Sequence, residues 1–315
     1  MQGGERYNSI SDYLKCEFGG KTIKLSIDAG FTCPNRDGTK GYGGCAFCSA
    51  EGSGELASAY SPGSIATAID EQIARYEEKW QGANYLAYFQ AHTNTYAPVS
   101  ELKQKYYEAL NDPRIKGIVI ATRPDCLSNE VLDLLSEINE KYFMWIELGL
   151  QTIHEKTLDS LNICYKLSDY DKAVDVLSQR GIKIVTHLIL GLPNESIDEM
   201  IDSINYVSKK PIFGLKLHLM NIIKSSKLYD TMPDYTSFNS IDEYVDTVIK
   251  CLEIIPENIT IHRLTGDVPR KLLVSPEWSY QKRTILNKIN LELKNRNTHQ
   301  GAKFDIITNE DKRCN

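Results

Sequence analysis

Cys33–Cys48 reads CPNRDGTKGYGGCAFC and supplies three cysteines, Cys33, Cys45 and Cys48. Structural zinc sites and iron–sulfur clusters normally use four protein ligands, so three cysteines leave one metal position open for another molecule. Four glycines lie between the first two cysteines, which lets the backbone turn tightly around a bulky group. The segment therefore predicts a metal centre, with an iron–sulfur cluster as the main interpretation and zinc as the alternative.

Strand and helix patterns alternate outward from this loop. Residues 22–28, TIKLSID, alternate apolar and polar side chains, which is typical of a half-buried strand. Further strands are expected at 85–91, 117–121, 142–151, 182–190, 212–221 and 259–264. Helices are expected at 11–15, 64–79, 99–111, 129–141, 196–209, 241–254 and 276–296, with one or two more within 154–180. This alternation predicts right-handed βαβ units and a parallel sheet.

The number of expected strands indicates the architecture. Six or seven in succession predict an α/β fold, a partial (β/α)6 barrel with a C-terminal helical extension. We expect a lead-in over residues 1–21, the barrel over 22–265 and the extension over 266–315. Ligands of parallel α/β sheets lie at the carboxyl ends of the strands. Because the cysteines follow the first strand, the other strand ends are expected to carry the remaining chemistry.

Composition limits the class of protein. The 315 residues contain no apolar run long enough to span a membrane, and the start MQGGERYNS lacks the apolar core of a signal peptide. We therefore expect a cytoplasmic protein with no membrane partner, whose other cysteines are reduced thiols. The net charge of −6 argues against a surface coated for nucleic acid, but residues 208–227 and 270–296 are rich in lysine and arginine. Solvated helix faces and a nucleic-acid footprint explain these two segments equally well.

Polar residues follow the second and third expected strands. Residues 89–98, FQAHTNTYAP, place Gln90 and Asn94 where a polar ligand can be bound. The third strand ends in ATRPDC, where Arg123 can meet a ligand carboxylate bidentately or form an ordinary salt bridge to Asp125.

The fourth and fifth expected strands carry further candidates. In WIELGLQT, Glu147 and Gln151 share the face that points into the barrel. A buried carboxylate needs donors, and ribose hydroxyls or an ammonium group would serve. The fifth strand, in THLILGLPNES, carries His187 and ends at Gly191, where a glycine permits close approach of a ligand. A core histidine is the alternative interpretation of His187.

The last two expected strands carry basic side chains. Lys216 and His218 alternate with leucines in LKLHLMN, and His262 and Arg263 lie in ITIHRLTGD. A strand with lysine and histidine on one face has a polar interior or a ligand there. We predict that these four residues contact the substrate.

Three motifs, Cys45-Ala46-Phe47-Cys48, ELGLQ at 147–151 and Gly191-Leu192-Pro193, resemble the radical S-adenosylmethionine (SAM) superfamily. The resemblance implies a [4Fe–4S] cluster on the three cysteines, with one open iron that binds the amino and carboxylate groups of SAM. It implies reductive cleavage of SAM to methionine and a 5′-deoxyadenosyl radical, and an external one-electron donor such as flavodoxin or ferredoxin. It also implies SAM contacts from Gln90, Asn94, Arg123, Glu147, Gln151, His187 and Gly191.

Two departures from the superfamily pattern narrow the resemblance. Eleven residues separate Cys33 from Cys45, where three are usual, and Asn162-Ile163-Cys164-Tyr165 stands where relatives often carry Asn-Arg-Gly-His. The wide gap resembles a small bacterial subfamily related to the radical SAM half of the Elongator catalytic subunit. That resemblance implies tRNA as partner and removal of the carboxymethyl group from 5-carboxymethylaminomethyl-uridine at the wobble position. Two alternatives stay open: a radical SAM enzyme acting on a metabolite or protein, and a non-enzymatic zinc or iron–sulfur scaffold.

Overall fold

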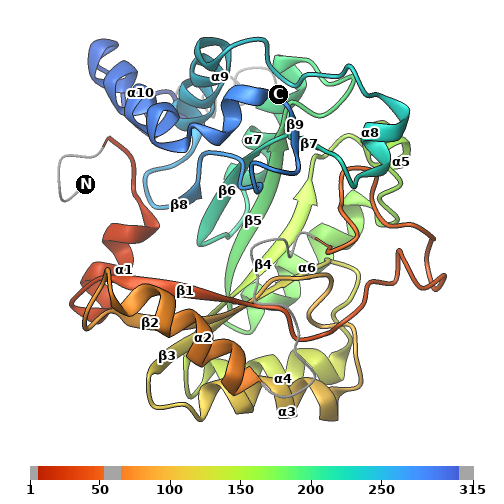
Figure 1. The fold of residues 1–315 in the computed structure, drawn as a ribbon, viewed down its shortest axis with the longest axis vertical. Coiled ribbons are helices and arrows are strands. Elements are labelled where there is room, and N and C mark those ends of the chain that lie inside the picture. Colours follow the sequence, from red (N-terminus) through yellow and green to blue (C-terminus); the bar gives the residue numbers. More distant parts are fainter. Residues whose placement is uncertain (1–5, 53–64, 305–315) are drawn as a thin grey trace.

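A parallel sheet of seven strands forms the centre of the computed structural model, which describes residues 6–52 and 65–304 (Figure 1). The strands lie in the order β1-β2-β3-β4-β5-β6-β8, and each is parallel to its neighbours. They are β1 (Thr22–Ile27), β2 (Asn84–Phe89), β3 (Ile115–Thr122), β4 (Phe143–Gln151), β5 (Lys183–Leu190), β6 (Gly214–Leu219) and β8 (Thr260–Arg263). The sheet curls into a half-barrel, which confirms the predicted α/β fold.

Helices connect the strands and cover the convex face of the sheet. They are α2 (Ile65–Glu77), α3 (Val99–Leu110), α4 (Asn129–Asn139), α5 (Glu155–Ser160), α6 (Leu167–Gln179), α7 (Ile197–Ser208) and α9 (Ile241–Ile254), preceded by α1 (Ile10–Phe18) and followed by η1 (Glu277–Tyr280) and α10 (Lys282–Asn295). At the starts of α1, α4, α7 and α9, a serine side chain accepts a hydrogen bond from a backbone amide. Such N-caps satisfy amides that have no partner within the helix.

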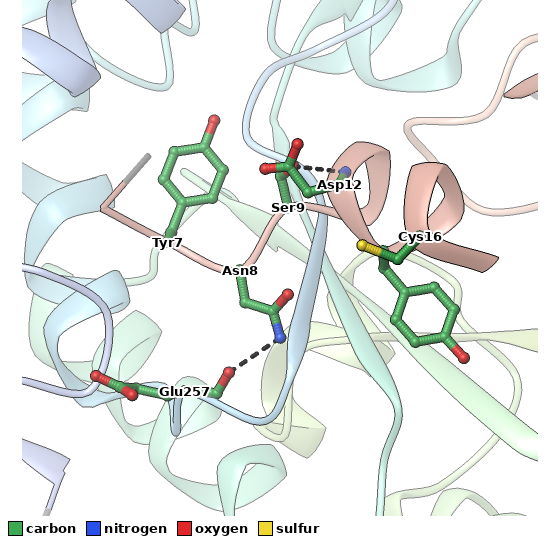
Figure 2. Close-up of a pocket in the computed structure, with 7 residues that line it drawn as sticks. Tyr7, Asn8, Ser9, Asp12, Cys16 and Glu257 are labelled. Atoms are coloured by element: carbon green, nitrogen blue, oxygen red, sulfur yellow. Dashed lines mark hydrogen bonds between the residues drawn. The ribbon is translucent and has the colours of Figure 1, made fainter. Parts of the chain in front are cut away.

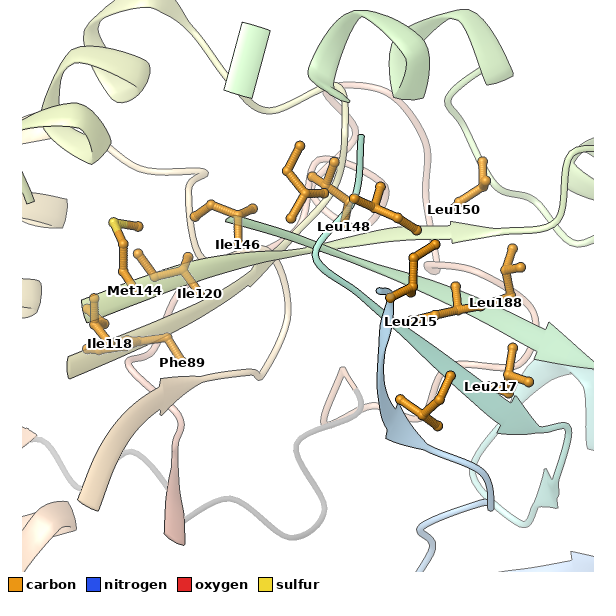
Figure 3. Close-up of a cluster of buried hydrophobic side chains, with 14 of the residues drawn as sticks. Phe89, Ile118, Ile120, Met144, Ile146, Leu148, Leu150, Leu188, Leu215 and Leu217 are labelled. Carbon is orange, nitrogen blue, oxygen red and sulfur yellow. The ribbon is translucent and has the colours of Figure 1, made fainter. Parts of the chain in front are cut away.

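Leucine, isoleucine and phenylalanine side chains at alternate strand positions form the larger core. Ile118, Ile146 and Leu188 are at most 1% exposed and lie on the same side of the sheet (Figure 3). The apolar faces of the helices pack against them, since period-two alternation sends every second side chain to that side. The intervening residues therefore point into the concave side of the half-barrel.

A second apolar layer closes the amino end of the concave side. Leu14 of α1 packs there with Trp145 and Val185, and the rings of Tyr13 and Phe213 meet edge to face at 4.9 Å. The backbone before α1 is tied to β8, because the amide of Ile261 donates to the carbonyl of Asn8 at 2.7 Å. This layer therefore covers the amino end of the half-barrel.

Three short elements have no counterpart in the sequence patterns. They are β7 (Ile222–Ile223), α8 (Lys227–Thr231) and β9 (Leu273–Ser275). β7 and β9 pair antiparallel, and α10 packs on α9, so the residues after β8 lie against the half-barrel. Elements of two to five residues are too short for hydrophobic periodicity to reveal. The predicted boundaries at residues 22 and 266 stay predictions.

Candidate active site

The cysteine loop begins directly after β1 at the carboxyl end of the sheet. The amides of Arg36 and Asp37 donate to the carbonyl of Cys33, at 2.8 and 3.3 Å, and the amide of Cys48 donates to that of Cys45 at 2.9 Å. The three cysteines are half-buried. Figure 1 shows this loop running beside α5 and α8, and backbone hydrogen bonds of Ala46 to Leu161 and Leu228 join the three segments.

Two asparagines hold the widened loop in place. The Asn162 carboxamide donates to the carbonyls of Tyr42 at 3.1 Å and Gly44 at 2.8 Å. Asn35 is fully buried and donates to the carbonyl of Asn162 at 2.6 Å and towards Sγ of Cys45 at 3.6 Å. The eleven-residue gap therefore docks on the turn between α5 and α6, in the position where relatives often carry Asn-Arg-Gly-His.

Cys164 completes this contact. Its thiol lies 2.9 Å from Oδ1 of Asn35, which accepts the hydrogen bond. A side chain at Gly41 would collide with both Asn35 and Cys164, so a glycine is needed where the loop crosses them. The loop backbone thus reaches this turn only because it carries no Cβ there.

The residues after β2 lie beside the cysteine loop. The amide of Thr93 donates to the carbonyl of Thr32, and that of His92 to the carbonyl of Gly52, at 3.2 and 3.0 Å. Gln90 lies next to the end of β1, where its amide donates to Ile27 at 3.3 Å. These contacts place the residues after β2 against the cysteine loop, and a role of Gln90 and Asn94 in binding SAM stays a prediction.

Several buried polar atoms at this junction have no hydrogen-bond partner among the residues that the structure describes. They are Ser49 Oγ, His92 Nδ1, Thr93 Oγ1 and Asn94 Oδ1. Such atoms are rare in folded proteins, because each costs the free energy of its lost hydration. Their grouping beside the three cysteines is what a polar ligand at this place requires.

Arg123 at the end of β3 is occupied by the protein's own carboxylate. Its Nε and Nη2 donate to the two oxygens of Asp125, each at 2.9 Å, and Lys40 of the cysteine loop contacts the same carboxylate at 2.8 Å. Arg123 and Lys40 together hold the pKa of Asp125 below its usual value, although burial opposes this. Of the two roles considered for Arg123, the structure shows the salt bridge to Asp125.

Glu147 lies in a network of protein donors on the concave face. Its carboxylate accepts from the Tyr88 hydroxyl at 2.7 Å, His187 Nε2 at 2.9 Å and Trp145 Nε1 at 3.0 Å, and forms an ion pair with Lys216. Burial alone would raise the pKa of Glu147, but the lysines facing it hold that pKa well below its usual value. The donors expected from ribose or an ammonium ligand are thus supplied by the chain, and contact with SAM stays a prediction.

The two remaining predicted SAM residues also have partners within the chain. Gln151 is the last residue of β4 and has a φ of 70°. Its side chain lies over Gly149, since a Cβ built on Gly149 would lie 2.7 Å from Nε2 of Gln151. At Gly191, φ is 80° and a Cβ would lie 2.6 Å from Ser237. The close approach that Gly191 permits is therefore that of Ser237 and Phe238, while an approach of SAM's adenine stays a prediction.

The four predicted substrate residues take different places. Lys216 is 1% exposed and forms an ion pair with Glu147, and its contact with the substrate stays a prediction. Nε2 of His262 and Oγ1 of Thr260 are joined by a hydrogen bond of 2.9 Å. The His262 ring meets that of Trp145 edge to face. Arg263 and His218 face the same concave side and are reached by solvent, and their roles are argued below.

Comparison with known proteins identifies the family. Residues 33–207 match the model of the radical SAM superfamily, and residues 212–295 match the radical SAM C-terminal domain. The chain belongs to the radical SAM superfamily. It is an enzyme of this class, which uses a [4Fe–4S] cluster and SAM, so the interpretation as a non-enzymatic scaffold is excluded.

Relatives of similar length extend over nearly the whole chain. It is 42% identical to YtqA of Bacillus subtilis, over 97% of this chain and 95% of that protein, and 36% identical to YhcC of Escherichia coli, over 88% and 89%. Elongator complex protein 3 of Homo sapiens is 27% identical over 50% of this chain and 29% of its own.

A solved structure supports the fold. The archaeal Elp3 of Methanocaldococcus infernus superposes with a TM-score of 0.65 and 15% identity, over 89% of this chain and 64% of that chain. At this identity the likeness concerns the fold alone. The chain spans about two thirds of the length of that structure.

The residues at the carboxyl end fit the cofactors of the family. Among the described residues no three His, Cys, Asp or Glu side chains converge on a single metal ion. In a [4Fe–4S] cluster each cysteine binds a different iron, so its ligands need not converge on one point. When bound, the cluster and SAM supply the 5′-deoxyadenosyl radical. The chain's share is to hold the cysteine loop, offer polar partners and keep water out.

A hollow of about 290 Å³ lies away from these residues, where the lead-in meets the turn before β8 (Figure 2). It is lined by Tyr7, Asn8, Ser9, Asp12, Tyr13, Cys16 and Glu257. None of the predicted site residues borders it. None of the helices in the described ranges, 6–52 and 65–304, is long and apolar enough to cross a membrane.

Proposed function

We propose that this radical SAM enzyme acts on tRNA and removes the carboxymethyl group of 5-carboxymethylaminomethyl-uridine at the wobble position. The observation that carries the proposal is the likeness to Elongator complex protein 3, in sequence over half of the chain and in fold over 89% of it. We further propose that Cys33, Cys45 and Cys48 ligate the cluster. Gln90, Asn94, Gln151 and Gly191 then line the SAM site that the unpartnered atoms around Asn94 leave open.

The substrate suits radical chemistry. The methylene between the amine and the carboxylate would give a hydrogen atom to the 5′-deoxyadenosyl radical, forming 5′-deoxyadenosine and leaving a carbon radical that both neighbours stabilise. Transfer of one electron to an oxidised one-electron carrier, with loss of a proton, gives an imine. Addition of water then splits the C–N bond and releases glyoxylate, leaving the 5-aminomethyl group on the uridine.

Exposed basic residues border the mouth of the half-barrel. We call Lys224, Lys227, Arg270 and Lys271 the mouth patch. The pairing of β7 with β9 brings its two segments together, and the amide of Lys224 donates to the carbonyl of Leu272 at 3.0 Å. The amide of Leu228 in α8 donates to Ala46 at 2.7 Å, so the mouth patch lies next to the cysteine loop. Such residues bind phosphates, which fix the position of an RNA without reading its sequence.

The test is a nucleoside analysis. Reconstituted enzyme is incubated anaerobically with tRNA carrying 5-carboxymethylaminomethyl-uridine, SAM and a reductant, and the digested nucleosides are measured by mass spectrometry. We expect the 5-aminomethyl product and an equal amount of glyoxylate. Unchanged nucleosides alongside production of 5′-deoxyadenosine would contradict the proposal and favour a metabolite or protein as substrate.

A further inference from the structure

The charged residues on the concave face come from strands that are not neighbours in the sheet. Glu147 of β4 contacts Lys24 of β1, Tyr88 of β2 and Lys216 of β6. Side chains of strands so far apart in the sheet meet only on its concave side, because curling brings that side together. These residues therefore lie in the interior of the half-barrel, between the apolar layer at the amino end and the cysteine loop at the carboxyl end.

Positive charge exceeds negative charge in this interior. Glu147 is paired with Lys24 and Lys216, and Asp267 is paired with Arg263 and Lys282. Among the described residues no other carboxylate forms an ion pair with these four cations. Lys282 is 41% exposed, so within the interior three basic residues, Lys24, Lys216 and Arg263, share two carboxylates, and one further negative charge would balance them.

Three of the basic groups have hydrogen-bonding capacity left. In the described part of the chain Arg263 donates one hydrogen bond, from Nη2 to Asp267 at 3.1 Å, although a guanidinium carries five N–H donors. The ammonium of Lys24 reaches Glu147 only at 3.5 Å. Nε2 of His218 is buried and has no hydrogen-bond partner within residues 6–52 and 65–304, and the ring of His218 lies 5.0 Å from that of His187.

These groups lie close to one another and are reached by solvent. Arg263 of β8 lies opposite Lys216 of β6 in the sheet, and Lys216 and Lys24 both contact Glu147. His187 bonds the same carboxylate, and its ring lies 5.0 Å from that of His218. The side chains of Lys24, His187 and Arg263 are 23%, 15% and 27% exposed, whereas Lys216 and Glu147 are 1% and 0% exposed. The Lys216–Glu147 pair is thus the closed floor of the interior, and the residues with spare donors lie on its open side.

We propose that Arg263, Lys24 and His218 form an anion-binding subsite in the half-barrel that receives a carboxylate of the substrate. A guanidinium matches the two oxygens of a carboxylate in its plane, and a lysine and a neutral histidine supply further donors. The identity of this carboxylate rests on the proposed function, in which it is the carboxylate of the carboxymethyl group. The subsite would then hold the group that is to leave, with its methylene directed towards the cysteine loop.

The first test uses bromide as an anion probe and needs no tRNA. Anaerobic crystals of the full-length, reconstituted enzyme are soaked in bromide, and anomalous density is compared between wild type and Arg263→Gln. We expect a bromide between Arg263, Lys24 and His218 in the wild type and its loss in the variant. Absence of bromide from the wild-type site would overturn the subsite, whatever the enzyme does to tRNA.

The second test measures discrimination between two tRNAs. Dissociation constants are determined, with SAM and without reductant, for tRNA carrying the carboxymethylaminomethyl group and for tRNA carrying the aminomethyl product. We expect the wild type to prefer the former about tenfold, a preference that Arg263→Gln loses and Arg263→Lys keeps in part. Arg180→Gln, which changes an arginine at the end of α6 paired with Asp133, is the control and should keep the preference.

The two tests separate the possible failures. An equal preference in wild type and Arg263→Gln, with both proteins folded by circular dichroism, would overturn the role of Arg263. Bromide at the site combined with unchanged wobble nucleosides would uphold the anion subsite and reject the proposed function. In that case the carboxylate belongs to a different substrate.

Discussion

The Asn162 side chain donates to the carbonyl of Gly44 at 2.8 Å, across a separation of 118 residues in the sequence. This contact ties the turn between α5 and α6 to the cysteine loop just before Cys45. Asn35 adds a bond in the opposite direction, from the loop to the backbone of Asn162. The additional residues of the loop therefore dock it on the turn between α5 and α6, which holds Cys45 close to that turn.

Replacing Asn162 should loosen the cysteine loop. Asn162→Ala removes two hydrogen bonds to backbone carbonyls and a residue suited to its φ of 55°, which together should cost about 1–3 kcal/mol of stability. We expect the reconstituted variant to lose iron to a chelator several times faster than the wild type. The measurement is the absorbance of the cluster against time.

A control variant and a second variant of Asn162 complete this experiment. Asn139→Ala removes a single exposed bond to the carbonyl of Gly181 and should leave iron loss unchanged. Asn162→Gly keeps the backbone conformation accessible but removes the side chain, so it should behave like Asn162→Ala. Wild-type iron retention in both Asn162 variants would refute the anchoring role.

The proposed cluster ligands make a sharper prediction. Alanine at Cys33, Cys45 or Cys48 should abolish formation of 5′-deoxyadenosine, because each thiolate would hold a different iron. Cys126→Ala and Cys251→Ala should retain it, since Cys251 lies on the buried face of α9 and the Cys126 thiol is directed towards the Asp125 carboxylate at 3.7 Å. Iron and sulfide analysis checks the prediction: about four irons per chain in the wild type and in the two controls. Activity in any of the three ligand variants would reject the assignment.

Much of the fold could be predicted because its elements are long and regular. Thr22–Ile27 alternates apolar and polar residues, and Ile241–Ile254 carries a helical apolar stripe. Local periodicity of this kind predicts these elements correctly, because the packing of the sheet and helices requires apolar residues at those positions. The placement of the cysteines at the carboxyl end followed from the order of strands and helices alone.

The partners of the site residues could not be predicted in the same way. Alternation in LKLHL indicated that Lys216 points inward, but its partner Glu147 lies two strands away in the sheet. Which carboxylate a lysine meets across a curled sheet depends on curvature, and no local pattern encodes that. The Asp125 partner of Arg123 was visible because only one residue separates them. The Asn35–Asn162 contact, over 127 residues, had no such signal.

The buried pair should contribute to stability as a unit. Glu147→Gln leaves Lys216 buried without its carboxylate, and Lys216→Met leaves Glu147 with the more distant Lys24. Each variant should lower the free energy of unfolding by about 3–5 kcal/mol. The double variant should lose less than the sum, because it leaves neither charge unpaired. Denaturant unfolding of the cluster-free protein measures this. Lys103→Gln, which breaks an exposed pair with Glu137, is the control and should cost less than about 1 kcal/mol.

Acid should destabilise the fold through the interior histidines. Burial, together with the nearby Lys216, lowers the pKa of His187 to about 4, against an ordinary value of about 6.5. Between these two pH values the unfolded chain binds a proton that the folded chain does not, so the free energy of unfolding falls as the pH falls. One such group contributes a slope of up to about 1.4 kcal/mol per pH unit. His187→Gln should therefore flatten the dependence between about pH 6.5 and 5 in denaturant unfolding, and an unchanged slope would contradict this.

The mouth patch should bind tRNA through its charge. Lys224→Gln and Arg270→Gln each remove an exposed cation beside the cysteine loop and should weaken tRNA binding at moderate salt. The slope of log affinity against log salt should fall by about one for each phosphate that the variant no longer neutralises.

Because phosphates carry no information about the wobble base, affinity should fall equally for tRNA with and without the carboxymethyl group. This separates the mouth patch from Arg263, whose replacement should act on the modified tRNA alone. A salt slope equal to that of the wild type in Lys224→Gln and Arg270→Gln would place the tRNA on another face of the enzyme.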